Sequence, residues 1–290
     1  SRVFTQPGQI GDVSSTERTR LARCIGNPCH PAHRAIKTVK LRVLSDLHLE
    51  CFAEPEDSGI RDDVECDAVV LAGDIHNGTV GIEWAARTFR VPVIYIMGNH
   101  EYYGYDATEL LPRARACAAD LGVYLLERDE VRINGTRFLG CTLWTGFDAG
   151  PLGWIQSSRI AHPIVADFSE ISNGARLLSP LQMVEWYEYS VGWLTRQLSV
   201  TDPAVVITHF APSLAVVNPM FGIGDELTPY FHNDLEALMG DAAPLWIYGH
   251  NHCSANEIIR PARGATHIVS DQLGYPDEHG PFQIDCIVET

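Results

Sequence analysis

The chain has 290 residues, of which 46% are hydrophobic and 20% are charged, and its formal net charge is −16. This composition suits a globular protein with a sizeable core, arranged as one large α/β domain or two small ones. The acidic balance argues against a nucleic-acid-binding surface, which would need a basic stripe. No apolar run approaches the roughly 20 residues that cross a bilayer. We therefore expect a cytoplasmic protein with no membrane partner.

Residues 1–38 are predicted to form an N-terminal extension. They are rich in Gly, Pro, Ser and Thr, show no helix or strand periodicity, and carry six basic and two acidic groups. Cys24 and Cys29 precede His30 and His33, but this spacing matches no standard structural zinc site. The eight cysteines include no CxxC pair and are expected to be reduced. We assign no chemistry to this extension.

The rest of the chain, residues 39–290, contains five short apolar runs of the kind that form buried strands. Each run is followed by polar residues, which are Asp46 and His48, then Asp74, then Asn99 and His100, then His209, then His250 and His252. Functional groups in open α/β sheets lie outside the carboxyl ends of the strands. We therefore expect these side chains to meet at one edge.

Asp, Asn and His are the oxygen and imidazole donors that suit zinc, manganese, iron and similar ions. The candidate ligands are too many for one ion. They are Asp46, His48, Asp74, Asn99, His209, His250 and His252. They are about the right number for two ions that share a bridging carboxylate.

Other elements follow in chain order. Helices are predicted at about residues 80–89, 107–120 and 180–198, and a short one at 233–239. In the helix at 180–198, Trp186, Tyr189 and Trp193 have the spacing of a buried face. A strand is predicted at 123–126, and a hairpin over 131–141 turns at Asn134-Gly135. Three more strands are expected near Glu257, Thr266 and Phe282.

Residues 144–178 are irregular and aromatic, and we predict that they form a lid or rim over the site. Long connections in a compact domain are often binding loops, and loops on a rigid scaffold commonly carry specificity. Trp144 and Arg159 are the candidate substrate contacts from this segment.

The ordered series D-x-H, GD, GNHE, a lone His and GHxH resembles the calcineurin-like metallophosphoesterase superfamily. The chain looks most like its small bacterial branch, with LSDLHLE, GNHEYY and GHNH. The resemblance implies a two-sheet αββα sandwich over residues 39–290, whereas the residue pattern alone supports only an α/β fold.

The resemblance also implies a binuclear centre of Mn, Fe, Zn, Co or Ni. One ion would take Asp46, His48 and His252, the other would take Asn99, His209 and His250, and Asp74 would bridge them. A hydroxide held between the ions would attack phosphorus. His100 would contact the phosphoryl oxygens and protonate the leaving group, a role suited to an imidazole. Asn99, His100 and Tyr103 join Trp144 and Arg159 as candidate substrate contacts.

The expected function is hydrolysis of a small phosphodiester. Protein Ser/Thr phosphatases of the superfamily carry an Arg and an Asp soon after the GD motif, whereas this chain has GDIHNG. Enzymes that cleave phosphomonoesters commonly use Lys or Arg to bind the doubly charged phosphate. None of the five motif segments contains Lys or Arg. The alternatives are a phosphomonoesterase, a promiscuous organophosphate triester hydrolase and, from another class, a non-catalytic scaffold with the same fold. The sequence leaves the oligomeric state open.

Overall fold

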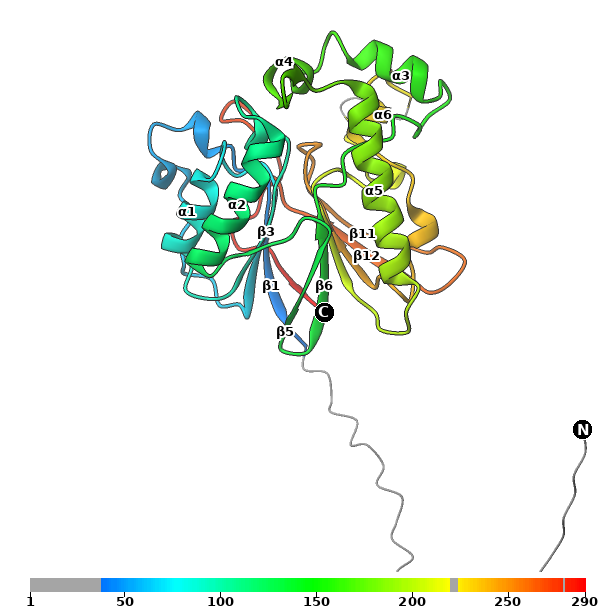
Figure 1. The fold of residues 1–290 in the computed structure, drawn as a ribbon. Coiled ribbons are helices and arrows are strands. Elements are labelled where there is room, and N and C mark those ends of the chain that lie inside the picture. The colour runs from blue at the N-terminus through cyan, green and yellow to red at the C-terminus, as the bar shows by residue number, and fades with distance from the viewer. Residues whose placement is uncertain (1–37, 220–223, 279) are drawn as a thin grey trace, which may run out of the picture. The chain divides into compact units, whose positions relative to one another are not determined.

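The computed structural model describes residues 38–219, 224–278 and 280–290 (Figure 1). The extension predicted for residues 1–38 therefore falls almost wholly outside the described residues. Among the described residues, no helix is both long and apolar enough to cross a membrane.

Two sheets form the centre of the domain. The first has the order β13-β1-β2-β3-β4 and is parallel except for β13. Its strands are β1 (Lys40–Leu44), β2 (Ala68–Ala72), β3 (Val93–Ile96), β4 (Tyr124–Leu125) and β13 (Ile287–Glu289). The second has the order β11-β12-β10-β9-β6-β5, with antiparallel strands only at its edges. Its strands are β5 (Asp129–Ile133), β6 (Thr136–Cys141), β9 (Val205–Thr208), β10 (Leu245–Ile247), β11 (Ala255–Ile259) and β12 (Thr266–Ser270).

The two sheets face each other across an apolar layer. Alternate residues of a strand point to opposite faces of its sheet, and β2 shows both faces buried. Val70 packs in the cluster shared with Ile207 and Ile247 of the second sheet, whereas Val69 and Leu71 pack in the cluster that includes the helices. Because both faces are covered, the strand has no polar positions, which explains the continuous apolar run.

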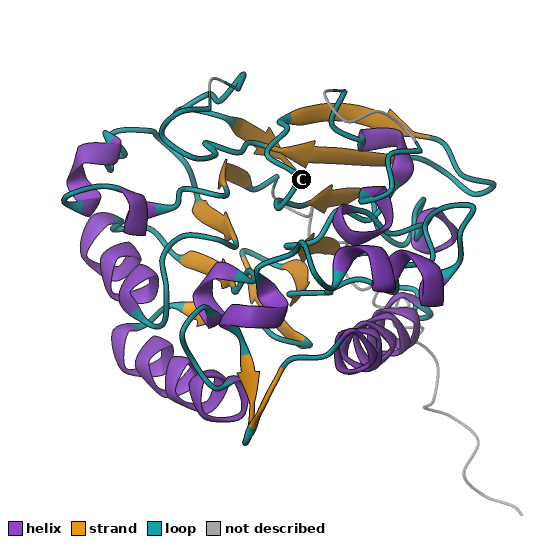
Figure 2. Cartoon of the chain, turned by 90° about the horizontal axis from the view of Figure 1, so that it is seen from above, coloured by secondary structure: helices purple, strands orange, loops and turns teal. Residues whose placement is uncertain are grey.

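Helices cover the outer faces of both sheets. Figure 1 shows α1 and α2 beside the first sheet and α5 beside the second, and the view from above shows strands between flanking helices (Figure 2). The helices are α1 (Val80–Thr88), α2 (Ala107–Leu121), α3 (Trp154–Ala161), α4 (Asp167–Glu170), α5 (Pro180–Leu198) and α6 (Thr228–Phe231). The predicted αββα sandwich is therefore confirmed, as are the helices predicted at 80–89, 107–120 and 180–198.

Four details of the sequence prediction were wrong. The segment 144–178 contains α3, α4 and the small hairpin β7 (Ser172–Asn173) to β8 (Arg176–Leu177). Residues 233–239 form only the 3₁₀ turn η5 (Glu236–Leu238). Phe282 lies in a loop, and the last strand is β13. Tyr189 is 69% exposed, because the buried stripe of α5 runs instead through Met183, Tyr187, Ser190, Leu194 and Leu198.

The fully buried Arg42 ties the C-terminal segment to the first sheet. Its Nε and Nη2 donate to the Ile284 carbonyl oxygen at 3.0 and 2.6 Å, and its Nη1 donates to the Arg61 carbonyl oxygen at 2.5 Å. Its guanidinium carbon also lies 5.8 Å from the centre of the Phe89 ring. One side chain thus joins β1 to two loops that are distant in sequence.

We expect Arg42→Ala to lower the free energy of unfolding by about 3 kcal/mol. The change leaves buried carbonyl oxygens without their hydrogen-bond donor and removes packed methylene groups. Urea unfolding measures the change. Arg90→Ala is the matched control, since that side chain is 93% exposed and its loss should cost less than about 1 kcal/mol. Equal effects of the two changes would contradict this account of Arg42.

Candidate metal centre

The residues predicted as metal ligands do come together, at the ends of β1, β2, β3, β9 and β10. Six of the seven are buried, and only His252 is partly exposed. Among the residues that the structure describes, three groups of side chains have ligand atoms within 4.8 Å of one another. These groups are Asp46 with His48 and His252, Asp74 with His209 and His250, and His48 with Asp74 and His100. The first group has the same residues as one ligand set implied by the resemblance, and the second holds His209 and His250 of the other set together with Asp74.

Asp74 lies between the two predicted sets. Its Oδ1 is 3.3 Å from His209 Nε2, and its Oδ2 is 3.9 Å from His48 Nε2. Burial by itself would raise the pKa of Asp74, but the neighbouring His209 and His100 hold it well below its usual value. An ionised carboxylate with its two oxygens facing different clusters has the arrangement that a bridging ligand needs.

The backbone of the ligand positions is unusual. Asp46, His48, Asp74, His250 and His252 all have positive φ, between 43° and 79°. Non-glycine residues rarely adopt this left-handed region, and such strain clusters at functional sites. Sharp turns after β1, β2 and β10 are what aim these side chains toward one point.

Two motif glycines are required by close contact. A Cβ on Gly98 would lie 2.1 Å from Asp74 Oδ1 and 2.7 Å from His209 Nε2. A Cβ on Gly249 would lie 2.1 Å from Ser45 Oγ and 2.6 Å from an oxygen of Asp46. The glycines before Asn99 and His250 therefore make room for the ligands of neighbouring strands.

Glu101 holds the backbone of two ligand loops, although the sequence pattern predicted no role for it. Its Oε2 accepts hydrogen bonds from the backbone N–H of Asp74 (3.0 Å) and of Gly98 (2.6 Å). Its Oε1 accepts from the N–H of Ile75 (2.9 Å) and from the Tyr95 hydroxyl (2.7 Å). This buried carboxylate joins the loop after β2 to the loop after β3. Its position in GNHE was the only signal in the sequence.

A second acid orients two histidines. Glu50 Oε1 lies 3.0 Å from the Nδ1 of both His48 and His100. Burial opposes ionisation of Glu50, but the hydrogen bonds from His100 and His48 lower its pKa to about 2. A carboxylate on Nδ1 leaves Nε2 of each ring free to face the site.

The loop after β12 covers the site with two residues that the sequence did not indicate. The Tyr275 hydroxyl lies 3.1 Å from His100 Nε2, and its ring centre lies 4.4 Å from that of His48. Glu278 Oε2 lies 2.5 Å from His252 Nδ1. Neither residue belongs to a motif, and no periodicity marks their loop.

The predicted rim segment reaches the site through α4. Asp167, which is fully buried, contacts both Asn99 and Tyr103. The Tyr103 ring stacks on His100 at 4.2 Å between ring centres. Arg159 lies on α3 with an exposed side chain. A substrate contact for Tyr103 or Arg159 stays a prediction.

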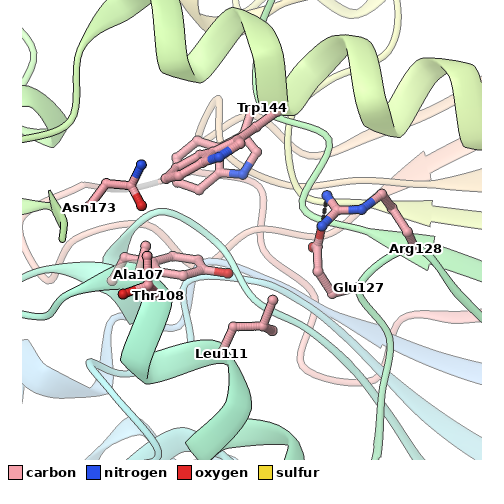
Figure 3. A pocket seen from close by; sticks show the side chains of 9 residues that line it. Ala107, Thr108, Leu111, Glu127, Arg128, Trp144 and Asn173 are labelled. Atoms are coloured by element: carbon pink, nitrogen blue, oxygen red, sulfur yellow. Dashed lines mark hydrogen bonds and ion pairs between the residues drawn. The ribbon is translucent and has the colours of Figure 1, made fainter.

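Trp144 lies in the wall of a separate cavity of about 180 Å³ (Figure 3). Trp186, Tyr102 and Arg128 also line this cavity, and none of the seven candidate ligands does. The Phe210 ring lies between Trp144 and the candidate ligand His250. Its ring centre is 5.6 Å from that of Trp144 and 3.9 Å from that of His250. Its role as a substrate contact also stays a prediction.

The donor set fits divalent transition metals. His250 Nε2 is buried and has no hydrogen-bond partner among the described residues. Burial, together with the neighbouring His209, lowers the pKa of His250 well below its usual value, which favours the neutral ring. A neutral imidazole nitrogen without a partner costs free energy in a dry interior, and metal coordination relieves that cost.

Residues 39–254 match the model of the calcineurin-like phosphoesterase family. The chain belongs to this family. Membership supports a metal-dependent phosphoesterase activity, and the family generally uses divalent metals.

Two individual proteins are also similar to this chain. An uncharacterized protein of Acanthamoeba polyphaga mimivirus is 24% identical over 273 residues, which cover 83% of this chain and 93% of that protein. The crystal structure of phosphopantetheinyl hydrolase from Mycobacterium tuberculosis superposes with a TM-score of 0.62 at 18% identity. That match covers 82% of this chain and 90% of the other, and it supports the fold.

We expect Gly98→Ala to weaken metal binding at least about 10-fold, because the new methyl group would displace the Asp74 carboxylate. Titration of the metal-free protein with Zn²⁺ against a chromophoric chelator measures the affinity. Gly192→Ala in α5 is the control, since the nearest atom to its Cβ would be 3.5 Å away. Unchanged affinity in the Gly98 variant would show that the close contact is unimportant.

Proposed function

We propose that the protein hydrolyses a phosphodiester with two divalent metal ions held at the strand ends. The observation that carries the proposal is the position of Asp74, whose two carboxylate oxygens face different groups of ligands. In this proposal Asp46, His48 and His252 hold one ion and Asn99, His209 and His250 hold the other. The ions would supply Lewis acidity toward the phosphate oxygens and an acidified water as nucleophile.

His100 is proposed as the group that protonates the leaving oxygen. Burial opposes its protonation, but Asp74 and the hydrogen bond with Glu50 raise the pKa of His100 to about 9. Because Nδ1 faces Glu50, the transferable proton is the one on Nε2. That atom lies beside the Tyr275 hydroxyl, on the side of the ring away from Glu50.

A diester is favoured over a monoester by the charges around the site. In the described part of the chain, no Lys or Arg hydrogen-bonds or forms an ion pair with any of the seven candidate ligands. The acidic side chains that hydrogen-bond to these ligands are Glu50, Glu101, Asp167 and Glu278. A monoester carries nearly two negative charges near neutral pH and a diester carries one. Two divalent ions can balance the smaller charge without a cationic side chain.

The preference is tested by comparing kcat/KM for bis-p-nitrophenyl phosphate and p-nitrophenyl phosphate at one pH and one metal loading. We expect the diester to be preferred. A clear monoester preference would refute the charge argument. A phosphotriester and a phosphopantetheinyl ester are also assayed, each with Mn, Zn, Fe, Co or Ni. If none of the four esters is hydrolysed, the result favours a non-catalytic scaffold.

We expect His100→Ala to retain the metal content of the wild type and to lose about 10²–10⁴ in kcat, the usual scale for a positioned acid. Steady-state kinetics and elemental analysis give the two quantities. His162→Ala, at an exposed position outside the ligand set, is the control for loss of an imidazole. A loss of metal from the His100 variant would make it a ligand instead.

A further inference from the structure

Asp167 is a buried carboxylate that the proposed reaction does not use. It begins α4, its side chain is fully buried, and it accepts hydrogen bonds from three side chains. Its Oδ1 accepts from Asn99 Nδ2 at 2.9 Å and from the Tyr103 hydroxyl at 2.8 Å, and its Oδ2 accepts from the Tyr230 hydroxyl at 2.9 Å. Burying a carboxylate is costly unless donors compensate, so a fold that keeps one here needs a reason for it.

These contacts fix the orientation of the Asn99 amide. Its Nδ2 donates to Asp167 Oδ1 and also lies 3.1 Å from the Tyr103 hydroxyl oxygen, so both N–H groups are used. Its Oδ1 faces His209 Nε2 at 3.0 Å. A flipped amide would set its oxygen against the Asp167 carboxylate, where both atoms are acceptors. The amide oxygen is therefore held toward the ligand cluster.

The groups that hydrogen-bond to Asp167 and could balance its negative charge are neutral donors. Burial raises the pKa of Asp167, and the hydrogen bonds from Tyr103, Tyr230 and Asn99 oppose that rise. No Lys or Arg among the described residues forms an ion pair with Asp167. The carboxylate is thus compensated only by neutral donors, one of which is a candidate metal ligand.

We propose that Asp167 is a positioning residue that holds Asn99 as a neutral oxygen ligand and so joins the 144–178 segment to the metal centre. This inference rests on the proposed function. It also explains why position 99 carries an amide. An aspartate there would place its second carboxylate oxygen against Asp167, whereas an asparagine offers one oxygen to the metal and two N–H groups to the supporting residues.

The test measures binding of Zn²⁺ or Mn²⁺ alone to the metal-free protein, by calorimetry and chelator competition. We expect Asp167→Ala to weaken one of two metal-binding steps about 10–100-fold, the usual effect of losing a residue that orients a ligand. Asp167→Asn should lose less, because its amide oxygen can still accept from Asn99. Glu170→Gln is the control, since this acid is exposed on the same helix.

An exchange of the two side chains separates positioning from a general structural effect. Asn99→Asp alone should weaken the same binding step, because two carboxylates then face each other. Adding Asp167→Asn to that variant restores an amide-carboxylate pair in reverse, and we expect it to recover at least 10-fold in affinity. Circular dichroism and Tm of the metal-free variants show whether each is folded.

Two results would overturn the inference. One is wild-type affinity at both steps in Asp167→Ala. The other is a double variant that binds no better than Asn99→Asp although it is folded. If the wild type binds fewer than two ions, the proposed binuclear function fails and this inference fails with it. If the wild type binds two ions and the Asp167 variants match it, only the inference fails.

Discussion

The four hydrogen bonds to Glu101 are the interaction on which the rest of the site depends. They join the backbone of Asp74, Ile75 and Gly98 to one buried carboxylate, and Tyr95 of β3 adds a fourth donor. The loops after β2 and β3 are thereby held at a fixed separation. These bonds help to hold the Asp74 backbone where its carboxylate faces both clusters. Asp74 Oδ1 also accepts a hydrogen bond from the backbone N–H of His100 at 2.9 Å. The same set of hydrogen bonds therefore positions Asp74 and the proposed proton donor His100.

The positions of the candidate ligands could be predicted because their sequence signals are local. Each ligand follows an apolar run that is buried on both faces, and the residue types are those that bind metals. Asp46, Asp74 and His250 could be assigned to strand ends before any contact was known. Glu50 and Glu101 lie within the same motifs, but their roles depend on which loops pack against them, and no local pattern encodes that packing.

The remaining supports come from distant parts of the chain. Asp167 lies 68 positions from Asn99, and Tyr275 lies 175 positions from His100. Their loops carry no hydrophobic period that would indicate burial. The same reason explains the misplaced last strand, since β13 has three residues and only Val288 is buried. In α5 the helical period is correct, and Trp186 and Trp193 pack partly buried against the core. Tyr189 is exposed because it lies about 200° around the helix from the buried Tyr187.

The C-terminal segment is hydrogen-bonded along the first ligand loop. Ser45 donates its N–H to the Asp271 carbonyl oxygen, and Leu273 and Gly274 donate theirs to the carbonyl oxygens of Ser45 and Asp46. The match to the family model ends at residue 254, before the segment that supplies this cover. Ligands and cover are thus encoded in separate stretches of one chain. A substitution in the cover can therefore change what reaches the site without changing the candidate ligands.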